Sequence, residues 1–423
     1  MNVVNLKDIV MNSCQCVKSE LSLFDKSPVQ TVILKGNFEE VYLIHPISGN
    51  DAPIEFLATS SDSDMFDLND SMLEVRGKVL YSDDTDITDG NVKPVALTLN
   101  SLFADMSIFL NEHKLEGGHF LYPYQSYFIN MLQTSSKYKK CQLDAAGFDS
   151  KHVDIENSRE FQYIGSLNSE FFSQGRYLLN QSTIRLKLTR HKAQFCLLNT
   201  ATLPVGKAGY KIKLTKAILH MRRCQINPSV LYGHEQGLIK QPAVYPIQHV
   251  EMITYTVAAG INSLSQDNIF SGQSPKLIVF GMVTNEAFNG TIKSNPFQFE
   301  HFDLSIATLS VNGEPITTQM DFKNKLCKRQ YMAMFQSLEM YNTTDESNGL
   351  TYEKWLNGNT LFVYNLCPDL AFDGEHGQVK SRPNIRLELQ FEKSLSKSIN
   401  IVMMSLTDGL ITIDKNREVT VSH

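Results

Sequence analysis

The sequence repeats one pattern at a fixed distance, and this repeat constrains the fold more than any other feature. The stretch Phe161–Leu188 aligns without a gap with Phe362–Leu389 at an offset of 201 (362 − 161), and both end in an IRLxL segment. Asn111, which follows an alternating apolar run, has a counterpart in Asn312 at the same offset. Matches that keep their order over such a length indicate a duplicated unit. The chain is therefore expected to fold as two similar halves.

Each half has the pattern of β-structure with one helix. Short apolar runs separated by Gly, Asn, Asp and Pro are typical of antiparallel strands, and about eight occur per half. A helical spacing interrupts them at Tyr122–Gln133 and again at Phe322–Tyr341. This arrangement predicts two tandem two-sheet sandwiches. We expect a first sandwich at residues 28–225 and a second at residues 226–423, after an N-terminal arm at residues 1–27.

The arm has a pattern of its own. Its apolar residues follow a helical spacing that weakens toward a break at Ser27-Pro28. These residues are Val3, Leu6, Ile9, Val10, Val17, Leu21 and Leu23. The pattern predicts either a short amphipathic helix on its own domain or an arm that docks on a neighbouring subunit or an inner surface.

Length, charge and cysteine content narrow the class of protein. A chain of 423 residues exceeds what one hydrophobic core usually holds. The net charge of −6 argues against nucleic acid as the main partner. Seven scattered cysteines, an odd number, are typical of reduced thiols in an intracellular compartment. Since the sequence shows neither a signal peptide nor a transmembrane run, a soluble protein that folds in the cytosol is expected.

No catalytic, cofactor-binding or metal site is predicted. The sequence lacks HExxH, the P-loop, GxSxG, and GxGxxG after a strand. Cys14-Gln15-Cys16 has the wrong spacing for a CxxC pair. His301 and Asp303 lie two apart in a predicted strand, and we interpret them as a structural pair rather than as metal ligands. No cofactor is expected.

Two acidic runs, Ser61–Asp70 and Ser82–Gly90, are the best candidates for a cation site, because dense carboxylates suit a hard cation such as calcium. A loop counted from Asp84, however, places Asp89 where an EF-hand needs glycine. We interpret both runs as solvated acids in turns.

Basic residues form short clusters and also recur in the duplicated strand. The clusters are Lys137–Lys140, Arg190–Lys192, Arg222-Arg223 and Lys325–Arg329, which are interpreted as ordinary surface charge. Arg185 and Arg386 occupy the same place in the two halves. A shared structural role, such as pairing with a carboxylate at a sheet surface, is therefore expected for this arginine.

Aromatic residues recur in segments that connect the predicted strands, namely Tyr122–Tyr124, Phe288–Gly290 and Asn295–Phe299. Such residues either cap the ends of the sandwiches or make subunit contacts. The sequence leaves both interpretations open.

Several stretches together resemble a known family. They are Cys16–Thr31, Ala52–Phe56, Gln194–Leu198, Asn268–Gly290, Asn295–Leu304 and Ile411–Val419. As a set they are similar to double jelly-roll major capsid proteins of icosahedral DNA viruses. The chain most resembles the hexon-type capsid proteins of Polinton (Maverick) elements and adintovirus-like viruses.

The resemblance implies an all-β fold with a few helices, built as a double jelly roll, and a structural protein rather than an enzyme. Three copies would form a pseudo-hexameric capsomer, and capsomers would form the icosahedral shell of a virion assembled inside the host cell. The implied partners are other copies of the chain and penton or minor capsid proteins, with no specific nucleic-acid site and no membrane span. Halves of this length leave little room for tower loops, so a smooth outer surface is expected.

Two other functions stay open at this point. A minor or penton virion protein is one, although a single jelly roll would suffice for it. A carbohydrate-binding or carbohydrate-cleaving β-sandwich is the other. It would need exposed aromatic residues or a pair of carboxylates, and the chain has one tryptophan, Trp355.

Overall fold

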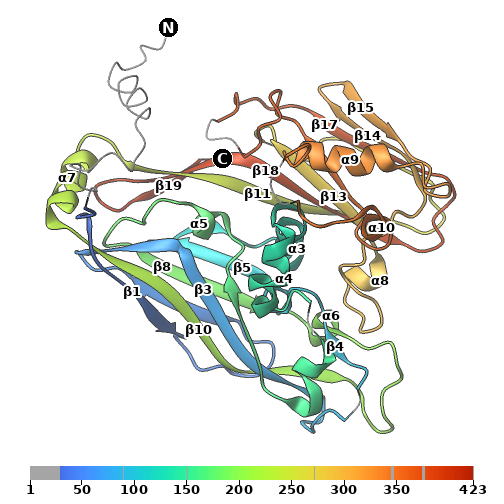
Figure 1. Cartoon of the computed structure of the whole chain (residues 1–423), viewed down its shortest axis with the longest axis horizontal. Coiled ribbons are helices and arrows are strands. Elements are labelled where there is room, and N and C mark those ends of the chain that lie inside the picture. The colour runs from blue at the N-terminus through green and yellow to red at the C-terminus, as the bar shows by residue number, and fades with distance from the viewer. Residues whose placement is uncertain are drawn as a thin grey trace, which may run out of the picture.

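The computed structural model describes residues 29–88, 90–149, 151–270, 272–343, 347–373 and 377–422. The strands up to Ile226 and those from Ala243 onward form separate sheets, and helix α7 (Pro228–Leu238) lies between the two sets (Figure 1). We propose the domain limits 28–225 and 226–423 in agreement with this division. The predicted arm at residues 1–27 lies outside the described residues.

The first half is a sandwich of two antiparallel sheets with the strand orders β1-β10-β3-β7 and β2-β8-β5-β6. Its strands are β1 (Ile33–Tyr42), β2 (Ile54–Thr59), β3 (Asp64–Tyr81), β5 (Phe103–Leu110), β6 (His113–Glu116), β7 (Phe161–Ser166), β8 (Thr183–Arg190) and β10 (Tyr210–Ile226), with a small ladder of β4 (Lys93–Pro94) and β9 (Leu197–Leu198). Its helices are α2 (Thr98–Ser101), α3 (Tyr122–Gln133), α4 (Ser136–Lys140), α5 (Glu170–Ser173) and α6 (Ala193–Cys196), with short 3-10 turns at η3 (Gln142–Ala146), η4 (His152–Asp154) and η5 (Glu156–Ser158).

The second half repeats this topology, with the strand orders β11-β18-β13-β16 and β12-β17-β14-β15. Its strands are β11 (Ala243–Val257), β12 (Ser263–Gln266), β13 (Leu277–Thr284), β14 (Leu304–Val311), β15 (Glu314–Gln319), β16 (Leu361–Asn365), β17 (Ile385–Phe391), β18 (Ile399–Ile413) and β19 (Val419–Ser422), which adds to β18. Its helices are α8 (Asn285–Phe288), α9 (Lys328–Ser337) and α10 (Tyr352–Leu356). The order in which eight strands share two sheets is therefore the same in both halves, and it is that of a jelly roll.

Side-chain alternation explains why these segments form sandwich strands. In β8, every second residue is buried and the others are partly exposed, which places one face on the core and the other toward solvent. Strand β17 alternates in the same way. Strand β13 does not alternate, because nearly all of its residues are buried. Its sheet is therefore covered on both faces.

The structure confirms the repeat where the sequences match best. Leu186 of β8 pairs with Ile108 of β5, and 201 residues later Leu387 of β17 pairs with Leu309 of β14. The two ladders thus have the same register. The IRLxL match marks the same central strand in both jelly rolls.

The repeated asparagine makes the same turn twice. Asn111 and Asn312 both adopt positive φ, at 47° and 52°. The side-chain oxygen of Asn111 accepts a hydrogen bond from the amide of Thr183 at 2.8 Å, and that of Asn312 accepts one from the amide of Asn384 at 3.0 Å. Asparagine tolerates this backbone conformation and bonds locally, which explains its presence at both turns.

The gapless alignment is wrong by one residue at the sixth strand of each jelly roll. Gly77 pairs with Phe161, whereas the matching Gly281 pairs with Leu361 and not with Phe362. A Cβ on Gly77 would lie 2.7 Å from the Phe161 ring, and one on Gly281 would lie 2.7 Å from the Leu361 side chain. The close approach at the glycine therefore sets this register, and the aromatic match does not.

One helix prediction is confirmed and the other is too long. Helix α3 spans Tyr122–Gln133 as predicted, with a proline in its first turn, where a missing N–H is tolerated. In the second half, α9 covers only Lys328–Ser337 of the predicted Phe322–Tyr341. Lys325 and Glu339 have positive φ, at 57° and 59°, so the helix cannot extend through either residue.

We expect Gly281→Ala to destabilise the fold by about 1–3 kcal/mol, because overpacked side chains must shift. A Cβ there would lie 2.4 Å from the ring of Phe299 and 2.7 Å from Leu361. Chemical denaturation measures the change. Gly175→Ala is the control, since a Cβ at Gly175 meets no atom within 4 Å. Equal stability of the two variants would contradict the close-approach argument.

Candidate functional site

The first acidic run lies mostly in a strand, so its interpretation as solvated turn acids holds for Asp62 and is wrong from Asp64 onward. Within Ser61–Asp70, strand β3 begins at Asp64. Arg223 lies 3.4 Å from the Asp64 carboxylate, and Arg222 lies 3.7 Å from that of Asp67. These carboxylates are paired with arginines of the neighbouring strand β10. The basic pair Arg222-Arg223 is accounted for by the same contacts.

The second acidic run is a solvated turn, as expected. Lys207 pairs with Asp83 at 2.6 Å, and Lys211 pairs with Asp84 at 2.6 Å. Hydrogen bonds from Lys207 and Thr85 lower the pKa of Asp83. Asp89 lies outside the described residues. In the described part of the chain, no group of three or more His, Cys, Asp or Glu residues is arranged to hold a metal ion.

The structure also locates the other predicted pair. His301 and Asp303 lie in a turn and not in a strand, because β14 begins only at Leu304. The imidazole Nδ1 of His301 accepts a hydrogen bond from the amide of Asp303 at 3.0 Å, and the ring stacks on Phe322. The pair is structural, as interpreted. Cys14 and Cys16 lie outside the described residues.

Two of the basic clusters contribute buried side chains rather than surface charge. The Lys139 ammonium donates to the backbone oxygens of Met131 at 2.6 Å and of Asn348 at 2.8 Å. Arg190 is buried and donates to the backbone oxygen of Ile212. The interpretation of these clusters as ordinary surface charge is therefore wrong for Lys139 and Arg190, which hold segments together.

The repeated arginine pairs with carboxylates in both halves, as expected. Arg185 lies 3.3 Å from Glu112 and sits over the ring of Phe109 at 4.4 Å. Arg386 lies 3.1 Å from Asp267. Because both arginines are partly exposed, each pair contributes roughly 0.2–1 kcal/mol.

Helix α3 contributes an aromatic contact between the two halves and lies between their sheets (Figure 1). Its Tyr127 stacks on Phe297 of the second half at 4.5 Å, with the rings nearly parallel, and Phe128 lies 5.3 Å from Phe299. Tyr124 touches the same two phenylalanines. The aromatic segments noted in the sequence thus meet inside one chain. The buried apolar residues of both halves form one continuous cluster.

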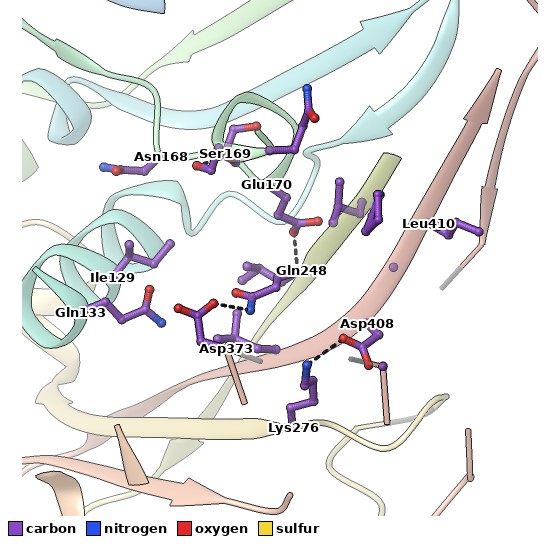
Figure 2. A pocket seen from close by; sticks show the side chains of 18 of the residues that line it. Ile129, Gln133, Asn168, Ser169, Glu170, Gln248, Lys276, Asp373, Asp408 and Leu410 are labelled. Atoms are coloured by element: carbon purple, nitrogen blue, oxygen red, sulfur yellow. Dashed lines mark hydrogen bonds and ion pairs between the residues drawn. The ribbon is translucent and has the colours of Figure 1, made fainter. Parts of the chain in front are cut away.

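A cavity of about 600 Å³ with both apolar and charged lining residues lies beside this contact. Figure 2 shows Glu170 on one side of it and Lys276 with Asp408 on the other, where the ammonium lies 2.9 Å from the carboxylate. Gln248 donates to Asp373 at 3.0 Å in the same cavity (Figure 2). The cavity is lined from both halves. These contacts pair four of the polar residues that line it.

Three titratable groups from distant segments meet next to the cavity. Glu116 accepts hydrogen bonds from the Ser169 hydroxyl at 2.8 Å and the Phe171 amide at 2.7 Å. His249 of the second half lies 3.4 Å from Glu170 of the first. Burial raises the pKa of both carboxyls to about 8, with the charge of Glu170 adding to the shift at Glu116, and burial lowers the pKa of His249. At neutral pH the cluster is therefore uncharged.

The outer face of the edge strand β1 carries large apolar side chains. Leu34, Phe38 and Tyr42 are 56%, 54% and 59% exposed. Phe38 and Tyr42 are four residues apart and so lie on one face of the strand, whereas Leu34 lies at a bulge where the pairing with β10 shifts between Ile33 and Lys35. A row of apolar residues on an edge strand invites association unless something covers it. We call these three residues the β1 stripe.

The sequence has few recognisable relatives. No protein-family model matches it. An uncharacterized protein of Caenorhabditis elegans is 20% identical over 315 residues, which cover 71% of this chain and 74% of that protein.

Solved viral structures are similar over nearly the whole chain. A chain of the Sputnik virophage matches with a TM-score of 0.65 and 11% identity, covering 96% of this chain and 92% of that one. The PBCV-1 virus capsid matches with a TM-score of 0.60 and 11% identity over 95% and 100% of the two chains. The mavirus major capsid protein matches with a TM-score of 0.57 and 11% identity over 96% and 93%. The fold is a double jelly roll. Among the described residues, no helix is both long enough and apolar enough to cross a membrane.

The stability of the protein is expected to fall as pH rises from 4.5, the usual value for Glu, toward 8, because Glu116 and Glu170 keep their protons in the folded state and lose them in the unfolded chain. A carboxyl whose pKa is higher in the folded protein than in the unfolded chain contributes its full stability at a pH below the unfolded pKa. This contribution is lost as the pH rises toward the folded pKa. Glu170→Gln should flatten this part of the melting profile. Thermal unfolding across this pH range, with the exposed Glu314→Gln as control, tests it. Parallel profiles for wild type and Glu170→Gln would refute the assignment.

Phe299→Ala is expected to destabilise the protein by about 3–5 kcal/mol, because it removes a fully buried ring from the contact with α3. The exposed Phe120→Ala is the matched control and should change stability little. Calorimetry measures both variants. A loss in Phe299→Ala no larger than in the control would show that the aromatic contact does not hold the halves together.

Proposed function

We propose that this chain is a structural major capsid protein, three copies of which form a pseudo-hexagonal capsomer of an icosahedral shell. The observation that carries the proposal is the match to the mavirus major capsid protein, which covers 96% of this chain and 93% of that one. The whole chain, and not one sandwich alone, shares the architecture of that protein. The matches to the Sputnik virophage and the PBCV-1 capsid support the same function.

The architecture suits a threefold assembly. Two similar sandwiches in each chain give six similar bodies around a threefold axis, so a trimer can occupy a hexagonal position in a shell. The continuous core between the halves keeps both sandwiches of one chain together. The β1 stripe supplies an apolar face that a neighbouring copy can cover.

The finer assignment rests on the sequence. The stretches that resemble capsid proteins of Polinton elements and adintovirus-like viruses support an origin in that group. A capsid function also implies location in the virion and contacts with penton or minor capsid proteins at shell positions that a trimer does not fill.

The alternative function as a carbohydrate-binding sandwich is not supported by the tryptophan that it would need at the surface. Trp355 is 0% exposed, and its indole N–H donates to the backbone oxygen of Leu361 at 3.0 Å. A buried indole offers no face to a sugar ring. The alternative as a penton or minor protein would not require two fused jelly rolls.

Purified protein tests the proposal directly. Light scattering over a wide concentration range should give the mass of three chains or of a larger assembly, and negative-stain electron microscopy should show threefold particles or shells. A strictly monomeric mass at every concentration would overturn the capsid function.

Phe38→Glu is expected to weaken assembly by about tenfold or more while leaving the fold intact, because a charge in an interface core is costly and an exposed one is not. Val205→Glu is the control, since Val205 is also exposed but lies outside the β1 stripe. Sedimentation velocity reports assembly and circular dichroism reports folding. Equal assembly of the two variants would exclude the β1 stripe from the interface.

A further inference from the structure

An apolar groove lies under helix α7, at the end of the molecule where the described chain begins (Figure 1). Its volume is about 570 Å³. The first half contributes Ile33, Met65 and Leu179, and the second half contributes Ala243 and Val244. Residues of α7 form the remaining wall. The groove is therefore shared by both halves.

Contacts at both ends of α7 fix the helix in position. The Asn227 side chain caps its first turn by accepting a hydrogen bond from the Ser229 amide, and it donates to the backbone oxygen of Thr31 at 3.1 Å. In the last turns, Glu235 pairs with Arg417 at 2.7 Å. Because these contacts hold the helix, it cannot simply collapse into the groove.

The wall of the groove leaves apolar surface uncovered. Val32 and Val244 line it and are both exposed. Gly233 and Gly237 of α7 also line it, and a Cβ on either would meet no atom within 4 Å. Leu238 is the only residue of α7 that is buried. The groove therefore has room for side chains from another segment.

The described chain begins at the mouth of the groove. Gln30 is itself a lining residue, and residues 1–28 lie outside the described part. The upstream sequence carries Val17, Leu21 and Phe24 within one short stretch. The five residue-to-residue steps from Phe24 to Val29 can span at most about 17 Å, which is enough for the chain to turn back.

We propose that residues 17–24 of the N-terminal arm fill this groove on their own chain. The apolar side chains cover the exposed valines and the two glycine positions of α7. Since both halves line the groove, the docked arm adds a further contact between the halves, far in sequence from α3. This docking concerns a single chain and is independent of the proposed capsid function.

Limited proteolysis of the full-length protein tests the docking. Trypsin cleaves after Lys18, which lies inside the docked segment. Gly237→Leu fills the groove without an internal clash, so cleavage after Lys18 should become about tenfold faster than in the wild type. Gln236→Leu, an exposed position of the same helix that does not line the groove, is the control and should leave the rate unchanged. Equal rates in all three proteins would overturn the proposal.

Disulfide trapping identifies which chain supplies the arm. Cys14, Cys16 and the exposed Cys141 are first replaced by serine, since the other cysteines are buried. Gly237→Cys is then combined with Leu21→Cys and, as control, Gln236→Cys with Leu21→Cys. We expect an intrachain disulfide only in the first pair, on non-reducing gels and by peptide mapping. A disulfide between two chains, or equal trapping in both pairs, would overturn docking on the same chain.

Discussion

Aromatic packing around α3 is the interaction on which the arrangement of the two jelly rolls depends. Helix α3 belongs to the first half, and three of its aromatic side chains contact Phe297 and Phe299 of the second half. These side chains are Tyr124, Tyr127 and Phe128. Burial of a large apolar side chain contributes roughly 1.5–3 kcal/mol, so this cluster outweighs any single ion pair at the surface. It turns two covalently linked sandwiches into one continuous core. The cavity of about 600 Å³ and the buried acid cluster lie beside this contact, with walls from both halves.

The two halves share the same strand pairing and turns but differ in which strand faces are buried. The paired central strands and the asparagine turn are the same in both, because the turn and the ladder each need one backbone geometry. The third strands differ: nearly all residues of β13 are buried, whereas β3 also has partly or fully exposed residues. The first half in addition carries the exposed β1 stripe at the edge of its sheet. Duplication followed by such divergence gives one chain two unlike faces. In the proposed capsid, these unlike faces would let one subunit meet different neighbours.

The polar residues that stand out in the sequence mostly serve the fold. Asp64 and Asp67 pair with arginines of the adjacent strand, and Lys139 binds backbone oxygens from both halves. The unusual electrostatics arise elsewhere, where burial raises the pKa of Glu116 and Glu170 beside the contact of the halves. No local pattern marks these two residues. Their environment depends on a segment of the second half more than 70 residues away, as the contact of Glu170 with His249 shows (249 − 170).

The sequence by itself determined the duplication, the two tandem β-sandwiches and the limits of α3, because periodicity and repeat spacing can be read along the chain. The jelly-roll class was expected only from the resemblance to capsid proteins. Only the tertiary structure decided which distant residues contact one another. The close approach of Gly281 to its neighbours set the register of its strand. The tertiary structure also placed the acidic residues from Asp64 onward in strand β3. Helix α9 is shorter than its sequence pattern predicted. The tertiary structure also joined Glu116, Glu170 and His249 into one uncharged cluster. Burial and charge depend on which distant segments meet, and a linear pattern does not contain that information.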